Sequence, residues 1–244
     1  KYLNSPETPL FKKGQTLFAL DAAREAAGQQ HTLIIVEGYF DAVALHQAGI
    51  RHVAATLGTA LTPEHITVIR RFASNIVLLF DPDQAGVRAA LRTLDLFVNS
   101  GLSVKVVSLP EGDDPDTYVR QHGAEGFAAL HRAAPSLLDF AVEHSLRSAE
   151  SGSVEDRIRA VDAVLRILQK GAHPIEREER IRLVAERLGL NQQRLIERYP
   201  VLVSEGQRRP DRGMKPPAFS ASPTVKAYPE ERDLAHLLVQ GSLS

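Results

Sequence analysis

The sequence predicts an α/β protein: an open parallel sheet flanked by helices, followed by a small all-α helical bundle. Short apolar runs alternate with helix-like segments through the first half of the chain, which indicates βαβ crossovers and a parallel sheet. Gly49, Gly101 and Pro110 end three of these segments, as expected of residues that terminate helices and strands. After Asp116 only helical segments follow.

Four strands are expected in the first half, at residues 33–36, 52–56, 76–80 and 103–109. The first of them is a run of large aliphatic residues, which is typical of a strand buried on both faces. Helices are expected at residues 17–27, 41–48 and 84–99, and from Thr62 onward. Thr62 is a favourable N-cap, and Pro63 suits the first turn of a helix.

The second half is expected to hold helices at residues 124–133, 136–148, 154–170, 175–188 and 191–198. One apolar series recurs at three- and four-residue spacing, which predicts an amphipathic helix with one buried face. Its members are Val154, Ile158, Val161, Leu165 and Leu168. Proline, serine and arginine then predict a flexible linker at 204–229. Residues 231–240 begin another helical pattern.

Composition narrows the class of protein. The 244 residues, 43% hydrophobic and 24% charged, are typical of a soluble globular protein of one or two domains. The absence of cysteine excludes disulfides and cysteine-ligated zinc, and no apolar run reaches the roughly 18 residues of a membrane span. We therefore expect a cytoplasmic protein, and the start at Lys1 suggests a fragment. The net charge of -1 argues against a uniformly basic nucleic-acid-binding domain.

Carboxylates follow three of the four expected strands. They are Glu37 after the first, Asp81 and Asp83 after the third, and Asp113, Asp114 and Asp116 after the fourth. Because the carboxyl ends of parallel strands share one edge of a sheet, we expect these groups to gather there. Crowded carboxylates repel one another unless a cation lies between them. Oxygen ligands alone favour Mg²⁺ or Mn²⁺ over zinc.

Each of these groups of carboxylates also has a simpler interpretation. An Asp-X-Asp after a strand is commonly a turn or a helix cap, and residues 113–116 alone could be a solvated loop. Glu37 directly follows four aliphatic residues, so we expect it in a mostly desolvated position that requires a partner. The loop at residues 58–60 is too short for a phosphate-binding fingerprint, but it follows the second strand and could lie beside the metal site. The chain has no P-loop motif.

The dispersed histidines His31, His46, His52 and His65 are interpreted as structural or surface groups, because none has a paired spacing on one helix.

With Glu37-Gly38 after the first strand and Asp81-Pro82-Asp83 after the third, the sequence resembles the Toprim domain of topoisomerases, primases and nucleases. Residues 1–8 resemble the basic motif that precedes this domain in DnaG-type bacterial replicative primases. Residues 37–41 are similar to the Glu-Gly-Tyr-hydrophobe-Asp signature of that family, and residues 55–60 and 113–116 also match it. Many members carry glycine where Pro82 stands, but both flanking carboxylates are kept.

The resemblance implies a DNA-dependent RNA polymerase that makes short RNA primers at the bacterial replication fork, using two or more Mg²⁺ or Mn²⁺ ions and no zinc in this fragment. The catalytic residues implied are Glu37, Asp81 and Asp83. The implied metal ligands are Glu37, Asp41, Asp81, Asp83, Asp114 and Asp116. The residues implied to bind nucleotide and template are Lys1, Tyr2, Asn4, Ser5, Lys12 and Lys13.

The resemblance also implies a division of the chain. The expected parts are a remnant of a basic lobe at 1–26, a Toprim domain at 27–118, a helical bundle at 119–203, a linker at 204–229 and the start of a helicase-binding region at 230–244. The implied partners are a single-stranded DNA template, ribonucleoside triphosphates and, through that last region, the replicative helicase; we expect a monomer and no membrane. The alternatives are a Toprim-type nuclease or topoisomerase-like enzyme, and a non-catalytic Toprim scaffold.

Overall fold

The computed structural model describes residues 5–9, 11–80, 84–97, 100–110, 112–147, 153–171 and 173–208. The chain divides into a unit at Lys1–Ser204 and a second unit at Glu205–Ser244. Of the second unit only residues 205–208 are described, as the end of a helix, so the helix expected at 231–240 lies outside the described residues.

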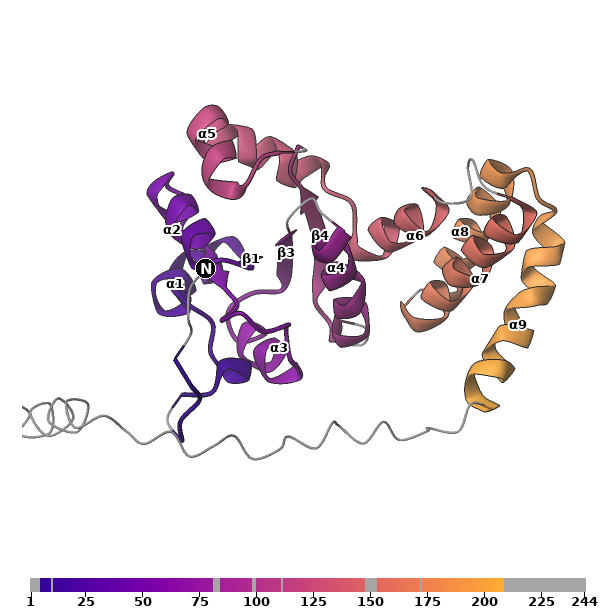
Figure 1. Ribbon diagram of the computed structural model, residues 1–244, viewed down its shortest axis with the longest axis horizontal. Coiled ribbons are helices and arrows are strands. Elements are labelled where there is room, and N and C mark those ends of the chain that lie inside the picture. The colour runs from indigo at the N-terminus through magenta and orange to yellow at the C-terminus, as the bar shows by residue number, and fades with distance from the viewer. Residues whose placement is uncertain are drawn as a thin grey trace, which may run out of the picture. The chain divides into compact units, whose positions relative to one another are not determined.

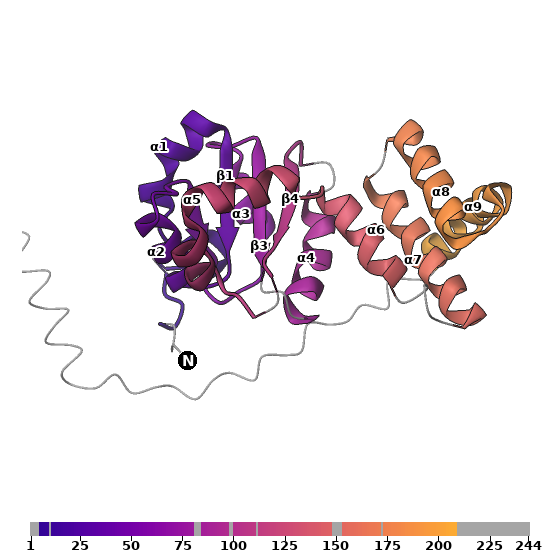
Figure 2. The same cartoon turned by 90° about the horizontal axis from the view of Figure 1, so that it is seen from above.

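The four expected strands are confirmed, and they form one parallel sheet in the order β2-β1-β3-β4. Their bounds are Thr32–Val36 for β1, Val53–Ala55 for β2, Asn75–Phe80 for β3 and Ser103–Ser108 for β4. Figure 2 shows β1, β3 and β4 side by side. The register aligns Val36 with Leu79, and Phe80 with Ser108, so the carboxyl ends of these strands lie at one edge.

Helices connect and follow the strands (Figure 1). The first half holds the 3-10 turn η1 at Lys13–Gln15 and the helices α1 at Leu20–Gln30, α2 at Tyr39–Gln47, α3 at Pro63–Ile69 and α4 at Gln84–Phe97. The second half holds α5 at Pro115–Ala133, α6 at Leu137–Arg147, α7 at Val154–Gly171, α8 at Pro174–Leu188 and α9 at Gln192–Arg208.

The alternating side chains of the strands produce two cores, one on each face of the sheet. Leu33 and Ile35 of β1 pack into one core with residues of α1, α3 and α4. Ile34 and Val36 pack into the other with residues of α2 and α5. All five residues of β1 are buried, which confirms that this run of aliphatic residues lies between two helical layers.

Neighbouring segments form hydrogen bonds with the backbone of β2 at the outer edge of the sheet. Phe18 forms an antiparallel bridge with Ala55, with backbone hydrogen bonds of 2.8 and 3.0 Å. The ring of His46 on α2 lies 2.9 Å from the carbonyl oxygen of Val53 through Nε2. Pairing of this kind removes free backbone groups that could recruit another strand.

The two largest differences from the expected helix boundaries are at the start of α5 and the end of α9. Helix α5 begins at Pro115, because Asp114 caps it by accepting a hydrogen bond from the backbone N–H of Thr117 at 2.7 Å. Within α5, Gly123 has a φ of 65°, a left-handed value that breaks the helix where the first segment had been expected to start. Helix α9 continues through Pro200 to Arg208, beyond the expected linker boundary at 204.

The helical bundle has its own core, formed by α6, α7, α8 and α9. Val161, Leu165 and Leu168 of α7 are buried in it, as the spacing predicts. The first two members of the same apolar series are not: Val154 is 64% exposed and Ile158 is 52% exposed. The apolar face of α7 therefore extends beyond the part that the described residues cover. In the described part of the chain, no helix is long and apolar enough to cross a membrane.

Candidate functional site

The carboxyl edge of the sheet has the geometry of a ligand site. The chain runs from β1 outward to β2 and then crosses back to β3 on the other side of β1. Ligands of open α/β sheets bind where the strand order reverses in this way, which here is between the ends of β1 and β3. Since Val36 is in register with Leu79, Glu37 leaves the sheet level with Phe80, the last residue of β3.

Glu37 is exposed, which corrects the expectation of a mostly desolvated carboxylate. The strand before it is fully buried, but the chain turns away from the sheet at Glu37 and Gly38 before α2 begins at Tyr39. At this edge the side chain passes beyond the two helical layers that cover the strand. An exposed carboxylate at the end of a strand is accessible to a cation or a substrate.

A pocket of about 280 Å³ lies beside Glu37. The loop after β2 forms part of it through Gly58, Thr59 and Ala60, so this loop lies next to Glu37. Helix α4 adds Arg92, Thr93 and Leu96, and the strand ends add Val36 and Phe80, among the lining residues. Sequence reasoning did not find Arg92, because no local pattern links a mid-helix arginine to a distant strand end.

Asp41 has a structural contact at this edge. Its Oδ2 accepts a hydrogen bond from the backbone N–H of Gly38, the N-cap residue, at 3.1 Å and so satisfies one free backbone donor at the start of α2. A Cβ atom at position 38 would lie 2.6 Å from the same oxygen. The Glu-Gly-Tyr-Phe-Asp sequence therefore requires glycine at its second position for close approach of the Asp41 carboxylate.

Asp114 and Asp116 lie at the start of α5. The hydrogen bond from Thr117 lowers the pKa of the Asp114 carboxyl, so this cap stays charged. Asp116 forms an ion pair with Arg120, with 2.8 Å between Oδ1 and Nε. The part of the chain that is described thus gives both carboxylates local partners on their own helix.

Across the described residues, no three acidic or histidine side chains come close enough together to hold a metal ion. Asp81 and Asp83 lie outside the described residues. The ligands expected from the sequence, Glu37 with Asp81 and Asp83, are all oxygen donors, which fits Mg²⁺ or Mn²⁺.

The N-terminal segment is held to α3 by a buried histidine. His65 has no exposed surface, and its Nε2 lies 2.9 Å from the carbonyl oxygen of Lys13 and 3.2 Å from that of Thr16. Its Nδ1 accepts from the backbone N–H of Thr62 at 3.2 Å, so Nε2 carries the proton. This confirms a structural role for His65.

The lysines predicted to bind nucleic acid lie on this held segment. Lys12 is exposed and Lys13 is half-buried, and Ser5 is also exposed. Lys1, Tyr2 and Asn4 lie outside the described residues. The backbone N–H of Lys13 donates to Glu7 Oε1 at 2.9 Å, which ties the turn to the segment before it.

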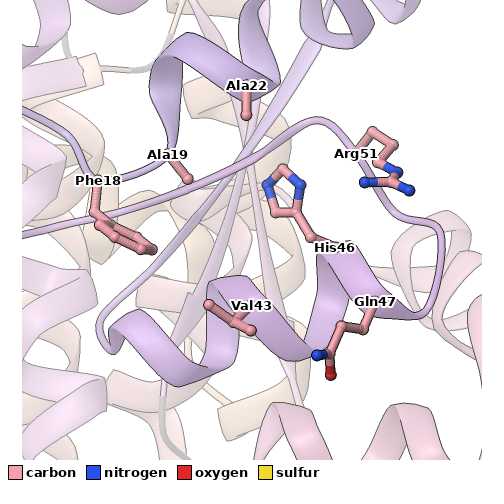
Figure 3. Close-up of a pocket in the computed structure, with 7 residues that line it drawn as sticks. All are labelled: Phe18, Ala19, Ala22, Val43, His46, Gln47 and Arg51. Atoms are coloured by element: carbon pink, nitrogen blue, oxygen red, sulfur yellow. The ribbon is translucent and has the colours of Figure 1, made fainter.

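A second cavity of about 280 Å³ lies between the start of α1 and α2. Figure 3 shows Phe18 and Arg51 on opposite sides of it, with His46 between them. None of the predicted carboxylates lines this cavity. It rests against the closed edge of β2 and is separate from the pocket beside Glu37.

His52, which directly precedes β2, has a lowered pKa. His52 is 8% exposed, and its Nδ1 has no hydrogen-bond partner among the described residues. Burial, together with charge repulsion from His131 and His46, lowers the pKa of His52 from 6.5 to about 4. The ring is therefore neutral at physiological pH, in keeping with a structural group.

Two family models match the chain. Residues 34–119 match a Toprim-like family, and residues 138–193 match the DnaB-helicase binding domain of primase. The second match falls on α6, α7 and α8, and not on the segment at 230–244 where we expected helicase binding to begin. The first match spans the sheet, Glu37 and the start of α5.

Relatives and solved structures agree with these matches. A DNA primase of Clostridium acetobutylicum is 37% identical over 198 residues, covering 81% of this chain and 33% of that protein. A DNA primase domain from Pseudomonas aeruginosa has a TM-score of 0.68 at 36% identity, covering 82% of this chain and 64% of that structure. A DnaG primase catalytic domain bound to ssDNA has a TM-score of 0.63 at 34% identity, covering 78% and 61%.

The fold and the first of these matches define residues 34–119 as a Toprim-like domain. Together with the helical region that follows, the chain belongs to the catalytic cores of the DnaG-type primases, which it matches in both sequence and structure. It spans about a third of the length of the curated primases that it matches.

Proposed function

We propose that this chain is the catalytic core of an enzyme that synthesises short RNA primers on single-stranded DNA for replication. The observation that carries the proposal is the placing of Glu37 beside the end of β3 and next to a pocket, at the reversal point of a parallel sheet. The relatives named above are primases, which favours synthesis over the alternative of a Toprim nuclease or a topoisomerase-like enzyme.

The acidic edge would carry out nucleotidyl transfer. Glu37, Asp81 and Asp83 would hold divalent metal, with Asp41, Asp114 and Asp116 adding negative charge around them. Bound Mg²⁺ or Mn²⁺ would supply charge neutralisation at the phosphates and a lower pKa for the attacking 3′-hydroxyl. The hydrogen bonds of Asp41 and Asp114 cap the starts of α2 and α5, which supports carboxylates at these two helix starts.

The template requires positive charge that the acidic edge cannot supply. We propose that Lys1, Tyr2, Asn4, Ser5, Lys12 and Lys13 contribute to a groove for the template and for ribonucleoside triphosphates. The hydrogen bonds of His65 support this, because they keep the turn that carries Lys12 and Lys13 fixed to α3. A related primase catalytic domain has been solved bound to ssDNA.

The match at residues 138–193 supports a replicative helicase as partner of the longer protein. We propose that the helical region takes part in this contact and that the chain is a monomer when alone. Co-sedimentation of this chain with the purified helicase tests the contact, and binding is the expected result.

Calorimetric titration with Mn²⁺ tests the metal site directly. The variants Glu37→Gln, Asp81→Ala and Asp83→Ala should each bind Mn²⁺ at least about tenfold more weakly, because each removes a charged ligand. Glu25→Gln, at an exposed acidic residue on α1, is the matched control and should bind like the wild type. Equal affinity in all four variants would show that the metal site is elsewhere.

A second experiment tests the polymerase reaction. The longer protein, with and without Glu37→Gln, is incubated with single-stranded DNA, ribonucleoside triphosphates and Mg²⁺, and labelled RNA is separated by size. We expect short RNA in the wild type alone. Release of nucleotides from the DNA without any requirement for triphosphates would instead identify a nuclease.

A further inference from the structure

Two side chains at the start of α3 hold the basic turn, which we define as residues 12–16. Thr62 is the N-cap of α3, and it exchanges hydrogen bonds with His65. The His65 backbone N–H donates to Thr62 Oγ1, and the Thr62 backbone N–H donates to His65 Nδ1, each at 3.2 Å. This pair is a capping box, in which glutamate or glutamine usually takes the second position. Histidine differs because its ring has a second nitrogen on the far side.

That second nitrogen bonds to the basic turn and not to the helix. The Nε2–H group of His65 points at two carbonyl oxygens, 2.9 Å from that of Lys13 and 3.2 Å from that of Thr16. The Thr62 hydroxyl donates to the carbonyl oxygen of Gly14 at 2.5 Å. A capping box needs none of these contacts. The two side chains therefore fix the backbone of the turn at Lys13, Gly14 and Thr16.

Thr62 also adjoins the loop that lies beside Glu37. Residues 58–61 of this loop line the pocket there, and Leu61 directly precedes Thr62 in the chain. The backbone of Gly14 approaches Thr62 closely, because a Cβ atom added to Gly14 would lie 3.3 Å from Thr62 Cγ2. The basic turn and the loop thus meet at one residue, which gives the turn a fixed place relative to the carboxyl edge of the sheet.

A lysine on an ordered turn binds a phosphate chain more favourably than a lysine on a free segment. A flexible segment loses conformational freedom when it binds, whereas a turn that is ordered beforehand does not. The shallow cavity that Lys12 lines also contains Glu7 and Glu64, which repel a polyanion. The position of the lysine therefore matters as well as its charge.

We propose that Thr62 and His65 are positioning residues for the single-stranded DNA template: they hold the basic turn so that Lys12 and Lys13 meet the phosphates in a fixed place. The inference rests on the proposed function, in which these lysines contribute to the template groove. His65 is fully buried and the Thr62 hydroxyl is bonded to the turn, so neither side chain contacts the template. Their effect on DNA binding passes through the two lysines.

The test measures binding of a fluorescently labelled oligothymidylate to this chain by anisotropy at low salt. His65→Asn keeps an acceptor near the position of Nδ1 but has no donor that reaches the turn, and Thr62→Val removes the hydroxyl that bonds to Gly14. Each should weaken binding about tenfold. His65→Gln has an amide N–H near the position of Nε2, and Thr62→Ser keeps the hydroxyl, so both should bind like the wild type.

Thr67→Val is the matched control. Thr67 is an exposed threonine on the same helix, and its hydroxyl donates to the carbonyl oxygen of Pro63 at 3.0 Å. Its loss removes a similar hydrogen bond from α3 and should leave DNA binding unchanged. Far-UV circular dichroism checks that each variant is folded, and Thr62→Val, which changes the shape of the side chain least, is the deciding variant if His65→Asn is not.

A double-mutant cycle separates positioning from general stability. His65→Asn and Thr62→Val are measured again in a chain that also carries Lys12→Gln and Lys13→Gln. If the two residues act through the lysines, they cause no further loss of affinity there. A purely structural role gives the same loss with and without the lysines, and that result would refute the inference.

The inference and the proposed function fail in different ways. If the double lysine variant binds DNA weakly while His65→Asn and Thr62→Val bind like the wild type, the template groove stands and the positioning role is refuted. If loss of both lysines leaves the affinity unchanged, or the wild-type chain binds no oligothymidylate, the proposed groove fails and the positioning role fails with it. Binding of Mn²⁺ by Glu37→Gln tests the metal site of the proposed function independently of both.

Discussion

The protonation of His52 makes the stability of the fold depend on pH. The ring is buried, and its pKa falls from 6.5 to about 4 in the folded chain. At pH values between these two, the unfolded chain binds a proton that the folded chain does not. Stability is therefore fully present above the unfolded pKa and decreases as the pH falls toward the folded pKa.

The size of the effect follows from the two pKa values. Lowering the pH from about 7.5 to about 5 should cost about 2 kcal/mol of unfolding free energy through His52 alone. Burial also lowers the pKa of His131 and of His144, so both act in the same direction and increase the total loss. The contribution of His52 must therefore be isolated by substitution.

Urea unfolding at several pH values, followed by circular dichroism, measures this contribution. His52→Gln removes the titrating ring, and its stability should fall by about 2 kcal/mol less than that of the wild type over the same pH range. His122→Gln, at an exposed histidine on α5, should keep the wild-type dependence. The comparison uses the change with pH, so a constant loss of stability in His52→Gln does not affect it.

Parallel curves for the wild type and His52→Gln would refute the reasoning. They would mean that His52 has the same pKa in the folded and unfolded chains, and that its ring reaches solvent or a hydrogen-bond partner. A shift of the stability maximum to lower pH in the variant is the outcome that supports a buried, neutral ring.

Further substitutions test local packing. Gly38→Ala should lower the unfolding free energy by about 1–3 kcal/mol, seen in urea titration, because its Cβ would displace the Asp41 carboxylate from its cap. Leu165→Ala should cost about 2–5 kcal/mol, while Val154→Ala, on the exposed end of the same helix, should cost less than about 0.5 kcal/mol; equal losses would contradict the packing described for α7. His65→Ala should speed amide hydrogen exchange at residues 11–16, and unchanged exchange would show that another contact holds this segment.

The sheet could be predicted from the sequence because each strand is a compact signal. Four aliphatic residues in a row, followed by a turn and a helix, specify a buried parallel strand with little ambiguity, and β1 and β3 follow this pattern. The order of the strands then fixed which carboxylates leave the sheet at one edge. Local pattern and topology together thus predicted the edge of the sheet at which Glu37 lies.

The sequence predictions were wrong where one type of residue can occur in several kinds of local structure. Asp114 was counted with an acidic loop, yet an aspartate before Pro115 is equally a helix start, and the structure uses it as one. The apolar series of α7 predicted a face but not what covers it, so the exposure of Val154 and Ile158 was missed. Glu37 was judged by its chain neighbours, although its exposure depends on where the covering layers end.

The pocket beside Glu37 could be predicted from the sequence only in part. Thr59 and Arg92 belong to a loop and a helix that meet only in the folded chain, and their separation in sequence has no regular spacing. The loop could be placed at the carboxyl edge of the sheet because it follows a strand. The arginine could not, since its position on α4 becomes meaningful only when the packing of that helix against the sheet is known.

Helix α6 belongs to two cores at once, which bears on how this chain can be divided. Leu137 at its start is buried with the sheet, and Leu146 near its end is buried in the bundle. The backbone N–H of Val106 on β4 also donates to the carbonyl oxygen of Pro135 at 3.0 Å. A cut between residues 118 and 119 would therefore leave the sheet without part of its own interior. A chimaera that exchanges the helical region between primases must retain α6 with the sheet and match its second half to the incoming bundle.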